Sequence, residues 1–209
     1  MINVVTIDFD VIMSPSIGFY NDLVGMSDPI GKYIDEFSFV ANLPANLYQY
    51  EYLTKYLMMA QKSVQDIYFI SSHEKVIDIL RDMPHDEEIC LINIDHHHDV
   101  GYDIDNWRLP LKNPEVGNWV KYGRDKKLFD HYYWIKNENS DDIPKEGKHY
   151  IDKEILFKNS KLEQYADQTD VLILCSSLEW IPPIYHPLFY TWQTICEEVN
   201  GKEYLIDSI

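Results

Sequence analysis

Three consecutive histidines between two aspartates form the most reactive group of residues in the sequence, within the segment IDHHHDV at residues 94–100. The segment follows ICLIN, an apolar run without alternation that is typical of a strand buried on both faces. Because side chains alternate along an extended chain, Asp95, His97 and Asp99 project to one side. Carboxylate and imidazole groups suit Zn²⁺, Mn²⁺ or Fe²⁺. We therefore predict a metal site here, with His96 and His98 facing the other way.

Other apolar runs also end in residues that could do chemistry. His73 follows IYFI, the alternating acids Asp8 and Asp10 follow NVVTI, and Glu179 follows VLILC. We predict His73 as a further ligand and Asp10 as a metal or substrate residue. Glu179, next to a tryptophan, could bind a cationic substrate, ligate a metal, or lie at a surface turn.

Short apolar runs alternate with amphipathic segments, which predicts one α/β domain over residues 1–209 with a mainly parallel sheet. In such sheets the site lies beyond the carboxyl ends of the strands. The expected strands lie at residues 3–9, 67–70, 89–94, 132–135 and 171–175. The expected helices lie at residues 46–61, 73–83, 118–129, 162–168 and 186–200, and residues 18–35 are expected to form a loop with some helix. Residues 137–148 are expected to be a loop, and residues 150–157 fit either class.

Composition limits the possible partners. The 209 residues carry 18 Lys and Arg against 35 Asp and Glu, a net charge of −17, which disfavours nucleic acid and anionic membranes and favours cations. Three scattered cysteines and the lack of a long apolar run fit a cytoplasmic protein. Motifs for phosphate loops, dinucleotide sites, nucleophile elbows and zinc helices are missing from the sequence. The 16 tyrosines leave a homo-oligomer possible.

The Asp-x-His-x-Asp run, followed by Val100-Gly101, is similar to the central metal motif of the ureohydrolases and of their histone-deacetylase relatives. Ser-Ser-His73-Glu resembles the ureohydrolase turn whose histidine binds manganese. The opening VVTIDFDVIMSPS and the closing CSSLEWIPP resemble a compact arginase-like branch that includes peptide arginases of ribosomal peptide biosynthesis. This resemblance implies a three-layer fold with helices on both faces of the sheet.

The sequence also departs from that family. Ureohydrolases carry a later Ser-x-Asp-x-Asp segment that supplies two carboxylates to a two-manganese centre, and this chain has no such segment. CSSLEWIPP could replace it, or could match the family's last strand, where a glutamate holds the guanidinium; we favour the second reading. Asp10 or the pair Asp152 and Glu154 could then complete the second metal site.

The resemblance implies a hydrolase that converts arginine side chains of a precursor peptide into ornithine and urea. Its metal ligands would be His73, Asp95, His97 and Asp99, and its cofactor one or two Mn²⁺. Asp99 would orient the water and carry its proton, His98 or His131 would protonate the leaving amine, and Glu179 would hold the guanidinium.

Two alternatives remain open from the residues alone. A single-metal amidohydrolase resembling a deacetylase would hold Zn²⁺ with Asp95, His97 and one further carboxylate, and would act on acylated amines. A non-enzymatic module, stabilised by a metal, would bind a basic peptide without turnover. The sequence does not choose between free arginine and a peptide as the substrate.

Overall fold

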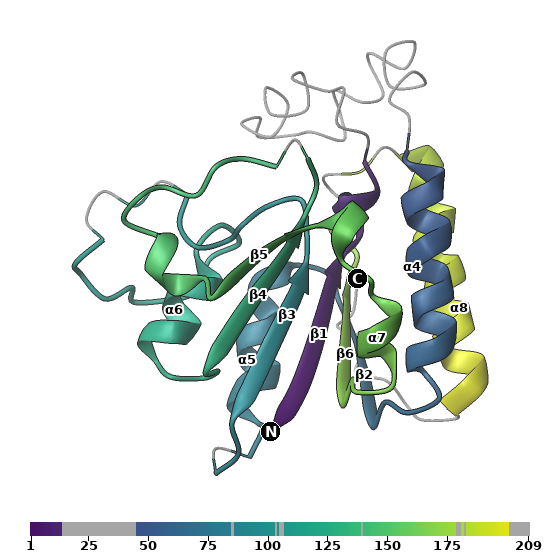
Figure 1. Ribbon diagram of the computed structural model, residues 1–209, viewed down its shortest axis with the longest axis horizontal. Helices are drawn as coiled ribbons and strands as arrows, with labels where there is room; N and C mark the ends of the chain where they lie inside the picture. The colour runs from purple at the N-terminus through teal and green to yellow at the C-terminus, as the bar shows by residue number, and fades with distance from the viewer. Residues whose placement is uncertain are drawn as a thin grey trace.

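The computed structural model describes residues 1–13, 45–84, 86–102, 104, 107–138, 140–178, 181 and 183–200. Within these residues, six strands form one sheet in the order β2-β6-β1-β3-β4-β5, and each neighbouring pair is parallel (Figure 1). The strands are β1 Ile2–Asp8, β2 Asp66–Ile70, β3 Ile89–Ile94, β4 His131–Lys136, β5 Lys153–Leu156 and β6 Val171–Cys175. The α/β fold with a parallel sheet is confirmed.

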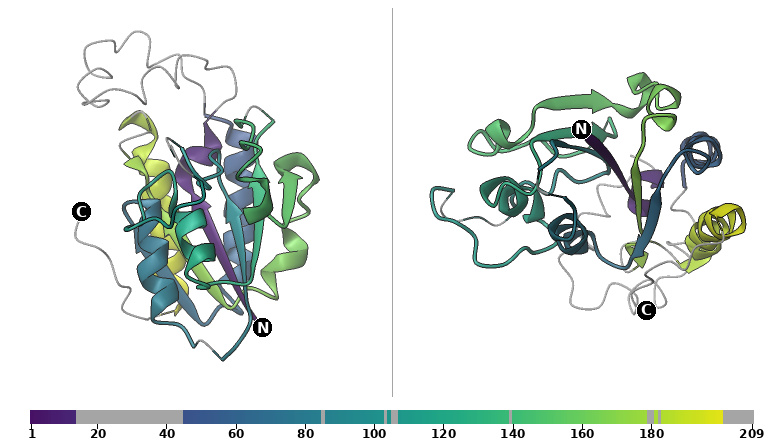
Figure 2. Two further views of the ribbon diagram at one scale, coloured as in Figure 1. Left: turned by 90° about the vertical axis from the view of Figure 1, so that its left-hand side faces the viewer. Right: turned by 90° about the horizontal axis from the view of Figure 1, so that it is seen from below.

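Helices cover both faces of this sheet, which makes the molecule three-layered (Figure 2). On one face, α4 contacts both α7 and α8. On the other face, α5 and α6 share a core with β3 and β4. The helices are α4 Leu47–Ala60, α5 Val76–Arg81, α6 Trp119–Asp125, α7 Glu163–Ala166 and α8 His186–Asn200. None of the helices within the described residues is long and apolar enough to cross a membrane.

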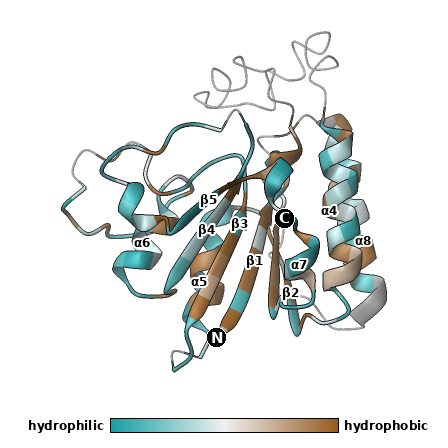
Figure 3. Cartoon of the chain, in the orientation of Figure 1, coloured by the Kyte–Doolittle hydropathy of each residue, from teal (hydrophilic) through white to brown (hydrophobic). Residues whose placement is uncertain are grey.

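The central strands hold the two cores together because their side chains point alternately to the two faces. In β1, Val5 and Ile7 join the core under α4 and α8, whereas Val4 joins the core under α5 and α6. All residues of β3 and β6 are buried, as expected for strands covered on both faces. Figure 3 shows these strands as mainly hydrophobic, while α4 carries residues of both kinds.

Helices α4 and α8 are fixed to the sheet by an aromatic group at the end of β1. The Trp192 ring lies 5.0 Å from Phe9, edge to face, and stacks on Tyr50 at 5.3 Å. Its indole N–H donates to Thr54 Oγ1 at 2.8 Å. This packing anchors the short 3₁₀ turn Phe9–Ile12 that follows β1.

Most predicted elements lie where the sequence placed them. The predicted boundaries of β3, β6 and α8 are those of the structure, and α4 begins and ends one residue inside its prediction. The helix expected at 73–83 begins as a 3₁₀ turn, His73–Lys75, before α5. The helix expected at 118–129 ends at Asp125, and Lys127 then takes a φ of 57°. The expectation for residues 18–35 lies outside the described residues.

Candidate metal centre

The chain segments that leave β1, β2 and β3 meet at the carboxyl edge of the sheet. Asp8 is the last residue of β1, and Asp10 lies in the 3₁₀ turn after it. His73 follows β2, and Asp95 directly follows β3. This is the edge at which sites are expected in open parallel sheets.

Asp8, His73 and Asp95 form a first group, which we call the inner triad. His73 Nδ1 lies 3.2 Å from Asp8 Oδ2 and 3.0 Å from Asp95 Oδ2. The side chains of His73 and Asp95 are each only 1% exposed, and that of Asp8 is 7% exposed. Buried carboxylates and imidazoles at this spacing offer one ligand atom each to a common ion.

The positions of these ligand atoms are compatible with a common metal ion. His73 Nδ1 is buried and has no hydrogen-bond partner of suitable geometry among the described residues, although three carboxylate oxygens lie within 3.2 Å of it. Two ligand atoms that each lie about 2.1 Å from one ion, at a right angle, are about 3.0 Å apart. The nitrogen and the oxygens therefore stand at the separations that neighbouring ligands of one ion adopt.

Asp10, Asp95 and His97 form a second group, the outer triad. His97 Nδ1 lies 2.9 Å from Asp10 Oδ2 and 3.9 Å from Asp95 Oδ1. Asp95 belongs to both triads, with Oδ2 toward His73 and Oδ1 toward His97. The carboxylate of Asp95 is thus placed to bridge two cations.

Asp99 stands beside the inner triad. Its Oδ2 lies 3.2 Å from His73 Nδ1 and accepts a hydrogen bond from the indole Nε1 of Trp119 at 2.7 Å. Asp99 has a φ of 50°, in the left-handed region that costs free energy for residues other than glycine. Such strain persists where the surroundings fix it and is common at functional sites.

Hydrogen bonds from neighbouring elements fix each member of the inner triad. Ser177, after β6, donates to Asp8 Oδ2 at 2.9 Å, and Asn93 Nδ2 donates to Asp95 Oδ2 at 3.1 Å. Thr6 Oγ1 lies 2.8 Å from His73 Nε2. When Nε2 carries the hydrogen and donates it to the threonine, Nδ1 presents a lone pair to the carboxylates, which is the form that binds a metal.

The two histidines of the triads hold protons strongly when no cation is bound. Burial disfavours the charged ring of His97, but the nearby Asp10 and Asp95 outweigh it and raise its pKa to about 10. Burial also disfavours the charged ring of His73, but the carboxylates of Asp8, Asp95 and Asp99 outweigh this effect and raise its pKa well above the usual value. Protons thus neutralise acids that a bound metal would otherwise neutralise.

The pKa values of the carboxyl groups are shifted in different directions. Burial and the charge of Asp95 raise the pKa of Asp99 to about 7, while burial and Asp8 raise that of Asp10. Burial would also raise the pKa of Asp95, but the His73 ring outweighs it and lowers the pKa below the usual value. Asp95 therefore loses its proton more readily than Asp10 and Asp99 do.

His98 lies next to the triads in an aromatic environment. Its ring stacks on Tyr102 at 4.3 Å and meets Trp134 edge to face at 5.9 Å. Burial, followed by the charge of His97, lowers the pKa of His98 to about 4, so the ring is neutral near pH 7. Its Nδ1 accepts from the Val100 N–H at 3.1 Å, which leaves the hydrogen on Nε2.

The structure thus brings together His73, Asp95, His97, Asp99 and Asp10 of the predicted site residues. Glu179 lies outside the described residues. The sequence interpretation missed Asp8 as a member of the triads, although its alternation with Asp10 repeats the spacing of Asp95 and His97 and could have signalled it.

Three residues considered for the site lie elsewhere. His131 is the first residue of β4, so it lies at the amino-terminal end of the strands, whereas the triads lie at the carboxyl-terminal end. It pairs with Glu88 at 3.0 Å, and the expectation that it protonates a leaving group is wrong. Asp152 accepts the Tyr132 N–H at 2.8 Å, and Glu154 pairs with Lys136. This acid pair is therefore occupied at the edge strand and does not complete the metal centre.

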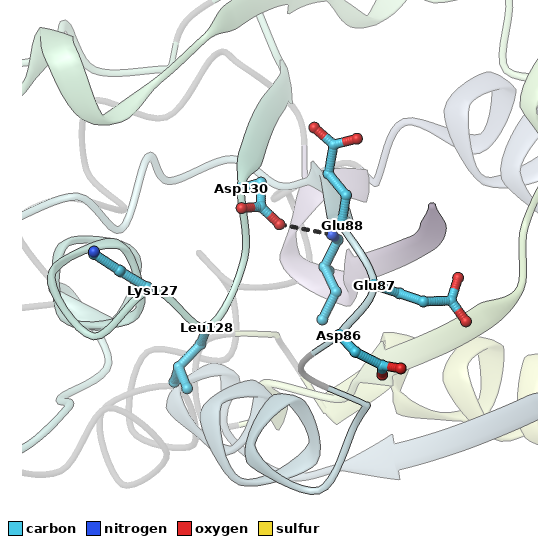
Figure 4. A pocket seen from close by; sticks show the side chains of 7 residues that line it. Asp86, Glu87, Glu88, Lys127, Leu128 and Asp130 are labelled. Carbon is cyan, nitrogen blue, oxygen red and sulfur yellow. Dashed lines mark hydrogen bonds between the residues drawn. The ribbon is translucent and has the colours of Figure 1, made fainter.

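Figure 4 shows a pocket rich in acidic side chains at the amino end of β3. Asp130 Oδ2 accepts the Ile89 N–H at 2.9 Å, and Glu87 pairs with the amino terminus at 3.3 Å. Glu88 faces His131. Since Asp130, Glu87 and Glu88 already have partners within the protein, we assign no function to the pocket.

The fold and the two triads define an α/β parallel-sheet protein with a buried Asp/His cluster that could hold metal ions. The chain matches no family model, no curated protein and no solved structure. The site therefore rests on its own geometry, and the likeness to ureohydrolases stays an expectation from the sequence.

Proposed function

We propose that the protein is a metal-dependent hydrolase with two cations, one at each triad. The observation that carries this proposal is the shared Asp95, whose two oxygens face the two triads. Two cations bridged by a carboxylate are a common arrangement for hydrolysis, because together they lower the pKa of a water molecule and make hydroxide available near neutral pH.

The donor set is compatible with manganese. The triads contain carboxylate and imidazole ligands without a thiolate, a donor set that suits Mn²⁺ and also Zn²⁺. The likeness of the Asp-x-His-x-Asp run to the ureohydrolase motif favours manganese. We therefore propose two Mn²⁺ per chain, with Zn²⁺ as the alternative.

We propose an arginine side chain within a peptide as the substrate. The likeness of the Asp-x-His-x-Asp run to ureohydrolases supports this choice, and a net charge of −17 attracts cationic substrates. In the reaction, the oxygen of water bonds to the guanidinium carbon and the bond from that carbon to the side-chain nitrogen breaks. The nitrogen takes up a proton, and the products are ornithine and urea.

Residues near the triads would transfer protons, donate hydrogen bonds and bind the substrate. Asp99, whose Oδ2 lies 3.2 Å from His73 Nδ1, would be a further ligand of the inner cation, and its other oxygen would accept the proton of the attacking water and pass it to the departing amine. His98 would donate a hydrogen bond from Nε2, because its neutral ring stores no proton near pH 7. Glu179 remains our candidate for pairing with the guanidinium.

The test is urea release from a metal-loaded, folded sample. We expect urea from arginine-containing peptides with Mn²⁺, none after chelation, and a peptide mass that falls by CH₂N₂ for each arginine converted. Free arginine serves as the comparison that separates a peptide enzyme from an ordinary arginase. If neither substrate released urea, the proposal that the protein hydrolyses guanidinium groups would be wrong.

Other outcomes of the same experiment point to the alternatives. One zinc ion per chain, with release of acyl groups from acylated amines, would indicate a deacetylase-like enzyme. Binding of a basic peptide without any turnover would indicate a metal-stabilised binding module.

A further inference from the structure

The two triads have different surroundings, although they share Asp95. In the inner triad and beside it, each carboxylate accepts a hydrogen bond from a separate donor. Ser177 donates to Asp8, Asn93 to Asp95, and Trp119 to Asp99. These donors lie after β6, within β3 and at the start of α6, so three elements hold the inner ligands in place.

The outer triad is held less firmly. Asp10 Oδ1 is buried and has no hydrogen-bond partner among the described residues. His97 is 22% exposed, whereas His73 is 1% exposed. In the described part of the chain, each triad thus has one buried ligand atom without a hydrogen bond, His73 Nδ1 or Asp10 Oδ1, and the difference lies in the exposure of His97 and in the hydrogen bonds to the inner carboxylates.

We propose that the inner position binds its cation more tightly than the outer one, and that Trp119 and Ser177 are positioning residues responsible for the difference. This inference rests on the proposed metal centre. Ligands already fixed by hydrogen bonds lose little freedom when a cation binds, and removing such outer partners typically costs about 10- to 100-fold in metal affinity. The inner cation is thus retained, while the outer cation exchanges with solution.

Unequal binding gives the two positions different tasks. The inner cation, enclosed by side chains, keeps Asp95 in place for its neighbour. The outer position, next to the exposed edge of His97, is where water and substrate arrive. Turnover should then follow the occupancy of the outer position and fall at low Mn²⁺ while one cation remains bound.

The experiment is a titration of chelator-treated full-length protein with Mn²⁺, followed by calorimetry and by electron paramagnetic resonance, without substrate. We expect two classes of binding, and we expect one cation to survive dialysis. Trp119→Phe, which removes the indole N–H and keeps an aromatic ring, should weaken only the tighter class, by about 10- to 100-fold.

Trp192→Phe is the matched control. Both tryptophans are fully buried, and both donate one hydrogen bond through Nε1. The bond of Trp192 ends on Thr54, in the core under α4 and α8. Because the Trp192 ring packs on Phe9, in the turn that carries Asp10, the comparison is made on the tighter class only. The control should leave the tighter class unchanged, so a general loss of packing cannot explain its weakening by Trp119→Phe.

Two further variants keep the test decisive. Ser177→Ala acts on Asp8 without touching an aromatic core and should also weaken the tighter class. His97→Ala should remove the weaker class and leave the tighter one. A single class of binding, or an equal weakening of both classes by Trp119→Phe and Ser177→Ala, would overturn the proposal.

The outcome is separate from that of the proposed reaction. Two cations bound with different affinities, without urea release, would contradict the proposed hydrolase and support this inference. Urea release by a protein that binds both cations with equal affinity would support the hydrolase and contradict this inference.

Discussion

Asp95 is the residue on which both triads depend. It is fully buried, has a pKa below the usual value, and faces His73 with one oxygen and His97 with the other. Asn93 and the His97 N–H hold it in place through hydrogen bonds of 3.1 and 2.8 Å. A change of charge at this one position should therefore affect both cations.

We predict that Asp95→Asn reduces the bound Mn²⁺ from two ions per chain to fewer than one and abolishes urea release. The amide keeps the shape of the side chain but loses the charge that a cation needs. Metal analysis after gel filtration measures the effect. Asp152→Asn is the control, because Asp152 is also an acid next to a strand of the sheet but belongs to neither triad: it accepts the Tyr132 N–H and pairs with Arg124 at 3.4 Å. Retention of two ions by Asp95→Asn would contradict the shared-ligand arrangement.

His98 makes a different prediction, since it lies near the triads without belonging to either. His98→Asn should lower kcat by about 10²- to 10³-fold, the usual contribution of a side chain that donates a hydrogen bond to the charge developing on the reacting atoms. The Mn²⁺ content should stay unchanged. Loss of metal together with activity would instead make His98 a support of the centre.

At the scale of elements, helix α6 connects the packing of the protein to its site. Trp119 begins α6 and donates to Asp99, while Gly123 on the same helix lies against Phe129 and Ile77. A Cβ added at Gly123 would lie only 2.4 Å from Phe129 Cε1. The glycine is therefore needed for the close approach of α6 to its neighbours.

We predict that Gly123→Ala lowers the free energy of unfolding by about 1–3 kcal/mol, the usual cost of overpacking a core. Helix propensity alone would favour alanine by about 1 kcal/mol, so the sign of the change decides between the two effects. Chemical denaturation measures it. An increase in stability would show that Phe129 moves aside at no cost.

The elements differ in how well the sequence predicts them, and the reason is burial. β3 and β6 are continuous apolar runs because both of their faces are covered, so their boundaries are readable. β5 is an edge strand with two exposed residues, Lys153 and Glu154, and its pattern fits no single class. A strand that is only partly buried leaves a weak signal in the sequence.

The candidate site was predictable to the extent that it depends on residues next to buried strands. Asp95, His97 and His73 follow such strands and could be recognised from their types and positions. The contact of Trp119 with Asp99 joins residues 20 positions apart through the docking of α6, which no local pattern encodes. Ser177 reaches Asp8 across 169 positions, for the same reason.

At the scale of the whole molecule, the centre exchanges protons for cations. Near pH 7 the pair of His97 and Asp10 holds a proton, because the pKa of His97 is raised to about 10 and that of Asp10 is raised as well. A cation needs the neutral imidazole and the ionised carboxylate, so binding must release that proton.

We predict that the affinity for Mn²⁺ at the outer position rises by about tenfold per pH unit between pH 6 and pH 8, for each proton released. The sign follows from the raised pKa of His97: below about pH 10 the proton competes with the metal, and raising the pH removes the competitor. Calorimetry in two buffers of different ionisation enthalpy counts the protons. An affinity that does not change with pH would mean that His97 is already neutral in the metal-free protein.

The order of the strands has a consequence for folding during synthesis on the ribosome. Strand β6 is the last of the described strands along the chain, yet it lies between β2 and β1 in the sheet. Until the ribosome has released residues 171–177, the strand that precedes His73 has no neighbour linking it to the strand that ends in Asp8. The nascent chain therefore cannot assemble the inner triad before residues 171–177 have been made and inserted, and capture of the metal awaits the last of the described strands.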